Sequence, residues 1–194
     1  MPEHPTLHTP RLTLRRFAPA DRDALFAIFS DPRTNTFLPW FPLQSREQAL
    51  EFYASRHAGP AAAWEYHYAI CRREDDLPIG YLDLGGDCHD LGYGLRSDCW
   101  GRGYAAEAAA ALVAQARRDG LPWLTATHDV NNPRSGRVMQ KLGMRYCYTY
   151  REQWQPKNIP VSFRLYQLNL DGDLRRVCRR YWDASAEHWV ESGL

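Results

Sequence analysis

The stretch Trp100-Gly101-Arg102-Gly103-Tyr104-Ala105 decides how this chain of 194 residues is expected to fold. It follows a short segment typical of a strand and precedes an alanine-rich run typical of a helix. A second stretch, Asn132-Pro133-Arg134-Ser135, also links a predicted strand to a predicted helix. Glycines at such a junction let backbone N–H groups approach an anion, and a helix N-terminus favours negative charge. The two junctions together predict a pocket for a phosphate-bearing ligand.

The segments around these junctions predict a sheet interleaved with helices. The first helix is expected from Gly101 to about Arg118. The second has Asn132 as a good N-cap, Pro133 at its first position and Gly143 as the residue that closes it. Apolar patterning and turn signals predict six strands, roughly Glu65–Arg72, Pro78–Leu84, Asp90–Leu95, Trp123–Val130, Arg145–Arg151 and Val161–Leu170.

The segment before these strands adds one strand and two helices. Alternating leucines predict a half-buried strand over Arg11–Phe17, and a helix begins at Asp21. An aromatic loop follows over Thr34–Pro42, and Ser45 with Gln48 forms a capping box for the next helix. The resulting order, β-α-α-β-β-β-α-β-α-β-β-α, is that of a mixed α/β domain.

The tail is expected to be helical. Its apolar residues recur at the spacing of an amphipathic helix, which is predicted within Asp171–Val190; these residues are Leu174, Val177, Cys178, Tyr181 and Trp182. We therefore expect one domain over residues 9–170, with residues 171–194 as a helical extension packed on the same domain.

Composition excludes several classes of function. The formal net charge of +1 gives no general electrostatic attraction to nucleic acid or membrane, and no apolar run approaches membrane-spanning length. The cysteines contain no C-x-x-C pair and no signal-peptide pattern precedes them, which favours reduced thiols in a cytoplasmic protein and no metal site. The five are Cys71, Cys88, Cys99, Cys147 and Cys178.

Other interpretations of the glycine stretch fit less well. Gly101-x-Gly103-x-x-Ala106 matches the dinucleotide fingerprint, with Asp119 as the ribose-binding acid. The strand before it, however, is not the buried β-branched strand of a parallel core, and Asp119 falls at a helix end. No Gly-Lys-Ser/Thr follows, so a Walker A loop is excluded. Ordinary helix caps remain the structural alternative for either junction alone.

The ordered set of motifs resembles the GCN5-related N-acetyltransferase (GNAT) superfamily, in the branch of the ribosomal-protein alanine N-acetyltransferases. The resemblance covers roughly Thr9–Leu170 and rests on four segments: Thr9–Arg15, Asp90–Leu95, Trp100–Ala105 with Glu107, and Asn132–Met144. It implies a GNAT-like acyl-CoA N-acyltransferase fold. In that fold a central, mostly antiparallel sheet is splayed between its fourth and fifth strands and flanked by helices, here with a C-terminal helix added.

The resemblance also implies acetyl-CoA as co-substrate, bound between Asp90–Leu95 and Leu124–Val130. Backbone groups of the glycine stretch would hold the pyrophosphate, and main-chain groups near Tyr93 would pair with the pantetheine arm. Asn132 would contact the pantetheine, and Ser135 would interact with the sulfur. The implied cofactor-binding residues are Tyr93, Gly94, Leu95, Trp100, Gly101, Arg102, Gly103, Tyr104, Ala105, Asn132 and Ser135.

Three residues are candidates for catalysis. Ser135 is expected to protonate or hydrogen-bond the departing sulfur, because Val138 and Met139 occupy the positions where many family members carry a tyrosine. Asn132 accompanies it. His128 has a suitable pKa for a general base, although a histidine at a strand end is more readily a surface residue. The base therefore stays open, with Asp83, Asp87 and Asp129 also near the expected cleft.

The sequence thus predicts an N-acetyltransferase that moves the acetyl group of acetyl-CoA to a primary amine by direct attack in a ternary complex. The acceptor is a protein N-terminal α-amine or the amine of a small molecule. The alternative is a CoA-binding regulatory module of the same fold without turnover. Nucleic acid, membrane and metal are not expected as partners, and the protein is expected to be a monomer or a homodimer.

Overall fold

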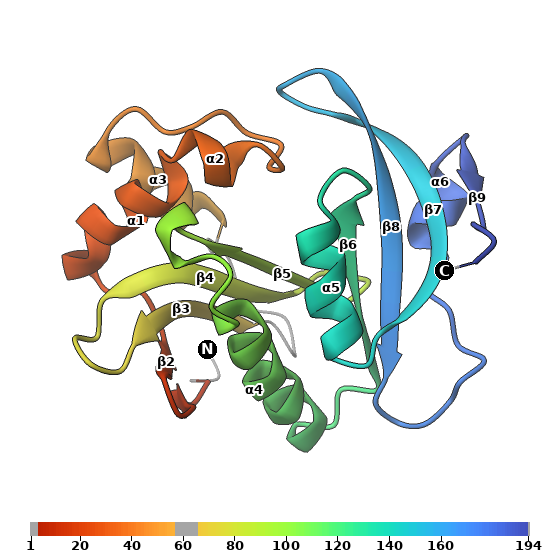
Figure 1. Cartoon of the computed structure of the whole chain (residues 1–194), viewed down its shortest axis with the longest axis horizontal. Helices are drawn as coiled ribbons and strands as arrows, with labels where there is room; N and C mark the ends of the chain where they lie inside the picture. The colour runs from red at the N-terminus through yellow and green to blue at the C-terminus, as the bar shows by residue number, and fades with distance from the viewer. Residues whose placement is uncertain (1–3, 57–65, 194) are drawn as a thin grey trace.

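The computed structural model describes residues 4–56 and 66–193, which form a sheet flanked by helices (Figure 1). The sheet has the order β1-β2-β3-β4-β5-β6-β8-β7-β9. The strands are β1 Leu7–His8, β2 Leu12–Arg15, β3 Tyr66–Arg72, β4 Pro78–Gly85, β5 Asp90–Leu95, β6 Trp123–Asp129, β7 Arg145–Trp154, β8 Ile159–Asn169 and β9 His188–Trp189. All neighbouring strands are antiparallel except β5 and β6.

The parallel pair divides the sheet into two halves. Between β5 and β6 the only register pair in the described part of the chain is Asp90 with Thr125. Beyond it the two strands diverge toward their carboxyl ends, whereas β4 pairs with β5 along its whole length, from Asp90 to Leu95. The splay between the fourth and fifth predicted strands is therefore confirmed, and it leaves one edge of β5 open.

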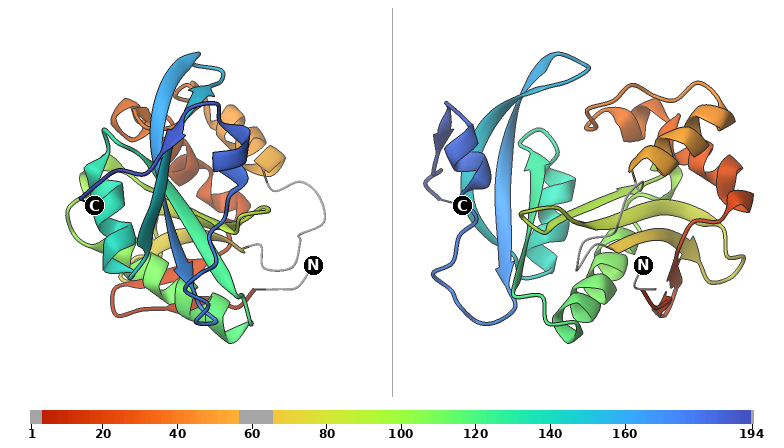
Figure 2. Two further views of the ribbon diagram at one scale, coloured as in Figure 1. Left: turned by 90° about the vertical axis from the view of Figure 1, so that its right-hand side faces the viewer. Right: turned by 180° about the vertical axis from the view of Figure 1, so that it is seen from behind.

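Helices cover both faces of the first half-sheet (Figures 1 and 2). Helix α4 lies on one face, helices α1 and α3 on the other, and α5 lies beside β6. The helices are α1 Arg22–Phe29, α2 Pro32–Asn35, α3 Arg46–Arg56, α4 Tyr104–Arg118, α5 Pro133–Lys141 and α6 Arg180–Ala184, with 3-10 turns at Pro19–Asp21 and Ser97–Cys99. Helix α4 begins three residues later than predicted, at Tyr104, because Gly101 and Gly103 both have positive φ, of 75° and 81°.

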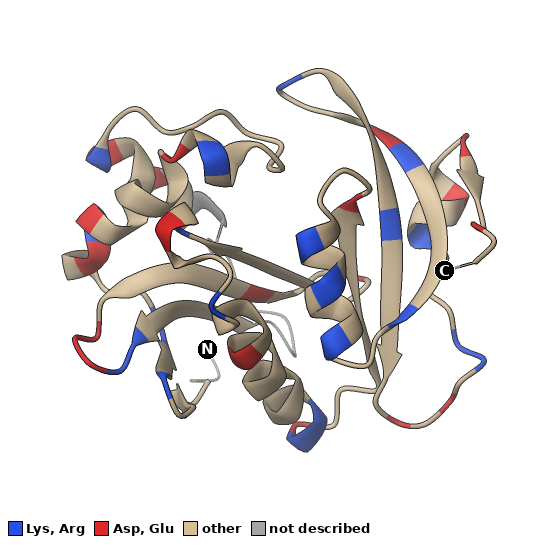
Figure 3. Cartoon of the chain, in the orientation of Figure 1, with Lys and Arg blue, Asp and Glu red and all other residues tan. Residues whose placement is uncertain are grey.

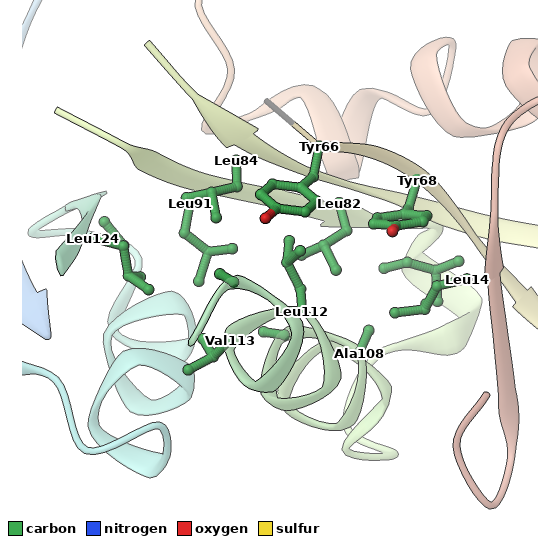
Figure 4. Packing of buried hydrophobic residues seen from close by; sticks show 14 of the residues in the cluster. Leu14, Tyr66, Tyr68, Leu82, Leu84, Leu91, Ala108, Leu112, Val113 and Leu124 are labelled. Carbon is green, nitrogen blue, oxygen red and sulfur yellow. The ribbon is translucent and has the colours of Figure 1, made fainter. Parts of the chain in front are cut away.

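The main core lies between the first half-sheet and α4 (Figure 4). Alternate residues of β3 and β4 point to this face, and Tyr66, Tyr68 and Leu82 are at most 1% exposed. The alanines of α4 let the helix lie close to the strands, and Leu112 fills the space between them. Burial of this apolar surface fixes the position of α4, and with it the position of the glycine turn that precedes the helix.

The prediction of a long amphipathic helix in the tail is wrong. Only Arg180–Ala184 forms helix α6, and His188–Trp189 adds a short strand to β7. In the segment between β8 and α6, the backbone binds polar side chains of β8 instead. Gln167 accepts from the Cys178 N–H at 2.7 Å, and Asn169 donates to the carbonyl of Arg176 at 3.0 Å. These bonds replace the ones a helix would make.

Aromatic side chains hold the tail against the second half-sheet. The ring of Tyr181 stacks on Tyr150 at 4.9 Å, and Trp182 packs edge-on against Tyr148. Leu174 and Val177, which were expected on the apolar face of a helix, are 65% and 42% exposed. Tyr181 and Trp182 thus anchor the segment whereas Leu174 and Val177 do not, so the helical spacing does not mark one buried face.

Candidate functional site

The N-terminus of helix α4 is open. Its N-cap is Gly103, in the left-handed conformation, and no side chain caps the helix. The first backward hydrogen bond runs from the Glu107 N–H to the Gly103 carbonyl at 3.1 Å. By helix geometry the N–H groups before Glu107 therefore have no intrahelical partner. Residues 101–103 are exposed, so this end of α4 can receive an anion.

The turn before α4 is supported from β2 and its preceding loop. The carboxylate of Glu107 accepts from Thr9 Oγ1 at 2.6 Å and from Arg11 Nε at 2.7 Å. The same guanidinium donates to the Arg102 carbonyl at 2.9 Å. Burial works against ionisation of Glu107, but these donors outweigh it and lower its pKa. Through this network Glu107 supports the turn before α4.

The N-terminus of helix α5 is closed by its own side chain. Asn132 is the N-cap, and its side chain accepts from the Ser135 N–H at 3.4 Å. Ser135 is then held from the other side of the opening, because Tyr93 Oη lies 2.9 Å from both its hydroxyl and its carbonyl oxygen. Burial raises the pKa of Tyr93, so the phenol stays protonated. The contact joins β5 to α5 across the splay.

The residues along the open edge of β5 differ in how accessible they are to a ligand. The carbonyl of Leu95 accepts from Trp100 Nε1 at 2.8 Å and from Thr34 Oγ1 at 3.1 Å. Gly94 is required by packing, because a Cβ there would lie 2.4 Å from the ring of Tyr81. Gly92 has nothing within 4 Å of such a Cβ. A ligand can therefore approach the backbone of β5 closely at Gly92, whereas at Gly94 the ring of Tyr81 occupies the space beside the backbone.

His128 lies inside the protein, so the expectation of a surface histidine is wrong. Its side chain is 4% exposed and faces α5, where a Cβ on Gly136 would meet the ring nitrogen Nε2 at 2.6 Å. Nδ1 lies 2.7 Å from the Asp129 carbonyl. Burial lowers the pKa of the ring, which favours the neutral form. A neutral imidazole packed under a helix has little room to take a proton from an incoming amine.

Basic side chains line one side of the opening. Arg134, Arg137 and Lys141 are exposed on α5, where Figure 3 shows basic bands along the helix. The guanidinium of Arg134 lies 5.8 Å from the centre of the Trp100 ring, and that of Arg33 lies 5.6 Å from the same ring. The ring of Trp100 therefore lies between helices α2 and α5, next to the glycine turn.

The aromatic residues of the loop after α2 and of β7 are largely used for packing. Trp40 packs against Phe29 and Phe52, while Phe41 is 58% exposed. In β7, Tyr148 donates to the carbonyl of Cys178 and Tyr150 stacks under the tail. The segment between Phe37 and Phe41 thus keeps one exposed ring, and the tyrosines of β7 hold the tail.

Sequence reasoning missed the bridge between the two halves at the top of the opening. Lys157, at the tip of the β7–β8 hairpin, donates to both the side-chain oxygen and the carbonyl of Asn35 at 2.8 Å. Asn35 is 3% exposed and ends helix α2. A lone lysine between a proline and an asparagine gives no local signal of such a contact, which depends on the length of the hairpin.

The described parts of the chain are residues 4–56 and 66–193. No group of three or more His, Cys, Asp or Glu side chains there is placed to hold a metal ion. No helix there is long and apolar enough to cross a membrane.

The splayed sheet, with an open helix N-terminus beside it, is an acetyltransferase fold. The chain is similar to a Vibrio cholerae protein proposed to be a ribosomal-protein-serine acetyltransferase, with a TM-score of 0.72 and 20% identity over 87% of this chain and 99% of that one. The model of the acetyltransferase (GNAT) domain matches residues 11–145. The chain therefore belongs to the GNAT family, as its motifs predicted.

Two curated relatives agree with this assignment. The chain is 24% identical over 170 residues to the uncharacterized N-acetyltransferase YoaA of Bacillus subtilis (strain 168), covering 84% of this chain and 96% of YoaA. It is 29% identical over 113 residues to the uncharacterized N-acetyltransferase p20 of Bacillus licheniformis, covering 56% of this chain and 64% of p20, just under two thirds of that relative's length.

Proposed function

We propose that this protein transfers the acetyl group of acetyl-CoA to a primary amine, by direct attack of the amine on the thioester in a ternary complex. The amine is the α-amine of a protein N-terminus or belongs to a small molecule. Membership of the GNAT family supports acyl transfer in general. The similarity to the Vibrio cholerae protein favours a protein N-terminus among the acceptors.

The observation that carries the proposal is the uncapped start of α4. N–H groups of residues 101–105 would bind the pyrophosphate, and the exposed cations of α5 would lie near the other phosphates. The open edge of β5 from Tyr93 to Leu95, with Trp100 beside it, would take the pantetheine arm.

Ser135 would be the proton donor for the departing sulfur. Its Oγ, held by Tyr93 at 2.9 Å, would donate to the thiolate, and Asn132 would hold the start of α5 in place. His128, buried beneath Gly136, would support α5 as a neutral ring. The described cysteines are free thiols, which is typical of a cytoplasmic protein. The oligomeric state, monomer or homodimer, stays a prediction.

The test is thermal unfolding of the purified protein with acetyl-CoA, free CoA or NADH. A ligand that binds only the folded state stabilises it by roughly 2.7 kcal/mol at 100 times its Kd. We expect the unfolding midpoint to rise with acetyl-CoA and with CoA, and to stay unchanged with NADH. No shift with either CoA ligand, or a shift with NADH alone, would refute the proposal. Thiol release with an amine then separates an enzyme from a CoA-binding module without turnover.

A further inference from the structure

A small polar cavity opens at the start of the splay, on the sheet face opposite α4. It has a volume of about 310 Å³, and its walls come from the end of the β4–β5 hairpin, from β3 and from β6. Leu82, Leu84 and Leu91 of these strands point to the α4 core. The residues between them point the other way, into or beside the cavity; they include His67, Asp83, Gly92 and Thr127.

Three of these residues form a row across the strands toward the cofactor edge. His67 of β3 is directly opposite Asp83 of β4, and Asp83 is directly opposite Gly92 of β5. Directly opposite residues on one face have side chains within contact distance. His67 Nδ1 accordingly lies 3.1 Å from Asp83 Oδ1. The next place in the row, at Gly92, holds no side chain.

The vacant place at Gly92 lies next to the cofactor edge of β5. Gly92 immediately precedes the segment from Tyr93 to Leu95, and nothing lies within 4 Å of where its Cβ would be. A group resting there would have the carboxylate of Asp83 on one side and the splay on the other. The His67 and Asp83 side chains are 23% and 20% exposed, so both are reached from the cavity but are partly shielded from water.

From this row we propose that Asp83, paired with His67, binds the ammonium group of the acceptor and acts as its general base. The acceptor is then a cationic primary amine. This inference rests on the proposed acetyl transfer. An α-amine near neutral pH is mostly an ammonium ion, which a carboxylate attracts. Asp83 with His67 accepts one proton from it, and the free amine attacks the thioester carbon.

The remaining steps balance the reaction. A C–N bond forms, the C–S bond breaks, and the second proton lost by the amine neutralises the thiolate. The proton held by Asp83 and His67 then leaves to water, which restores the base. The cavity also explains why the acceptor need not be apolar, since a second carboxylate, that of Asp90, lies in its wall.

The groups around Asp83 determine how a pH test is interpreted. His67 faces it from β3, Asp90 lies in the same cavity wall on β5, and Tyr53 reaches it from α3. Burial raises the pKa of Asp90, which also accepts from Thr125 and Tyr181. Burial and the negative charge of Asp83 raise the pKa of Tyr53 to about 12. Tyr53 therefore stays protonated near neutral pH, and both carboxylate oxygens of Asp90 already accept hydrogen bonds, which leaves Asp83 as the base.

The test is Asp83→Asn, with Asp23→Asn as its matched control. Asp23 is on helix α1, where its side chain is 67% exposed and pairs with Arg46. Thiol release is measured with acetyl-CoA and L-alaninamide, a small cation with a free α-amine, from pH 6.5 to 9.5. We expect kcat/KM of Asp83→Asn to fall by about 100-fold at pH 7. The loss should shrink as pH rises, because more of the amine is already deprotonated. Asp23→Asn should match the wild type.

A second variant separates catalysis from folding. His67→Gln keeps a polar side chain and should lower kcat about 10-fold with little change in the acetyl-CoA Kd, measured by calorimetry on the same samples. A loss in Asp83→Asn that is equal at all pH values, or shared by Asp23→Asn, would overturn the inference. So would wild-type protein that binds acetyl-CoA but releases no thiol with L-alaninamide. Failure to bind acetyl-CoA would instead contradict the proposed function.

Discussion

The starts of helices α4 and α5 lie on the two sides of one opening, and both follow a strand, yet they differ in chemistry. The α5 start uses its own Asn132 side chain as a cap, whereas α4 begins at Gly103, which has no side chain to cap with. In a capped helix a side chain already accepts a hydrogen bond from one of the first N–H groups, whereas in an uncapped helix these groups are free to bind a ligand. The anion site is therefore expected at α4, and α5 contributes a hydroxyl.

The two starts are alike in how they are held. Each depends on a side chain that is far away in sequence: Glu107 near the start of α4 binds Arg11 across 96 residues, and Ser135 in α5 binds Tyr93 across 42 residues. The supports differ in environment, because the Arg11 side chain is 48% exposed and the Tyr93 phenol is largely enclosed. The α4 support should thus respond to solution conditions more than the α5 support.

The largest expected effect comes from closing the α4 start. Gly103→Val places a β-branched side chain at φ 81°, where it strains the turn and moves the N–H groups. Loss of two hydrogen bonds to a charged ligand, at about 2 kcal/mol each, corresponds to roughly 1,000-fold weaker CoA binding. Calorimetry with CoA measures this.

Gly120→Val is the matched control for that variant. Gly120 follows the other end of α4 with φ 83° and open space around it, so the strain is similar, of order 1–3 kcal/mol. Its CoA affinity should equal that of the wild type. If both variants bind CoA equally well, the α4 start is not the phosphate site.

A smaller effect is expected at the α5 start. Ser135→Ala removes the hydroxyl near Tyr93 but leaves the Ser135 N–H that Asn132 accepts. If this hydroxyl protonates the sulfur, kcat should fall by roughly 100-fold, with the acetyl-CoA Kd within about two-fold. Steady-state thiol release and calorimetry give the two values.

Tyr93→Phe refines that result. It leaves the Ser135 hydroxyl in place but removes the phenol that orients it, so its kcat should lie between those of the wild type and Ser135→Ala. Equal losses of binding and turnover in Ser135→Ala would make the hydroxyl a binding group instead, and the two helix starts would then share one role.

The same comparison explains what the sequence could predict. Glycines 101 and 103, Asn132 and the alanine run are local signals, and the two helix starts were predicted from them to within three residues. The splay came from the family resemblance, since no local pattern indicates which strands diverge. The partners of Ser135 and Glu107 lie 42 and 96 residues away in sequence, and no local pattern indicates such helix contacts.

The failures have the same origin. The tail pattern is helical in spacing, but Gln167 and Asn169 of β8 bind its backbone in an irregular path. His128 looked like a strand-end surface residue because nothing in its neighbourhood shows that Gly136 lies over it. The row from His67 to Gly92 was also invisible, because it joins three strands through their register.

The smallest expected effect concerns the support of α4 in acid. Burial opposes ionisation of Glu107, but Thr9 and Arg11 lower its pKa below 4.5 in the folded state. A lowered carboxyl pKa gives stability that is complete above the unfolded value and is lost as pH falls through the folded one. Glu107→Gln should therefore cost roughly 1 kcal/mol at pH 7, since Arg11 is half exposed. This difference should shrink as pH falls through the lowered pKa of Glu107, because the wild-type carboxyl is then protonated.

Urea unfolding over a series from pH 7 down to about pH 2 measures it, with Glu74→Gln, an exposed carboxyl near Arg72, as control. A difference that persists at the lowest pH would mean that packing of the side chain, and not its charge, holds the start of α4.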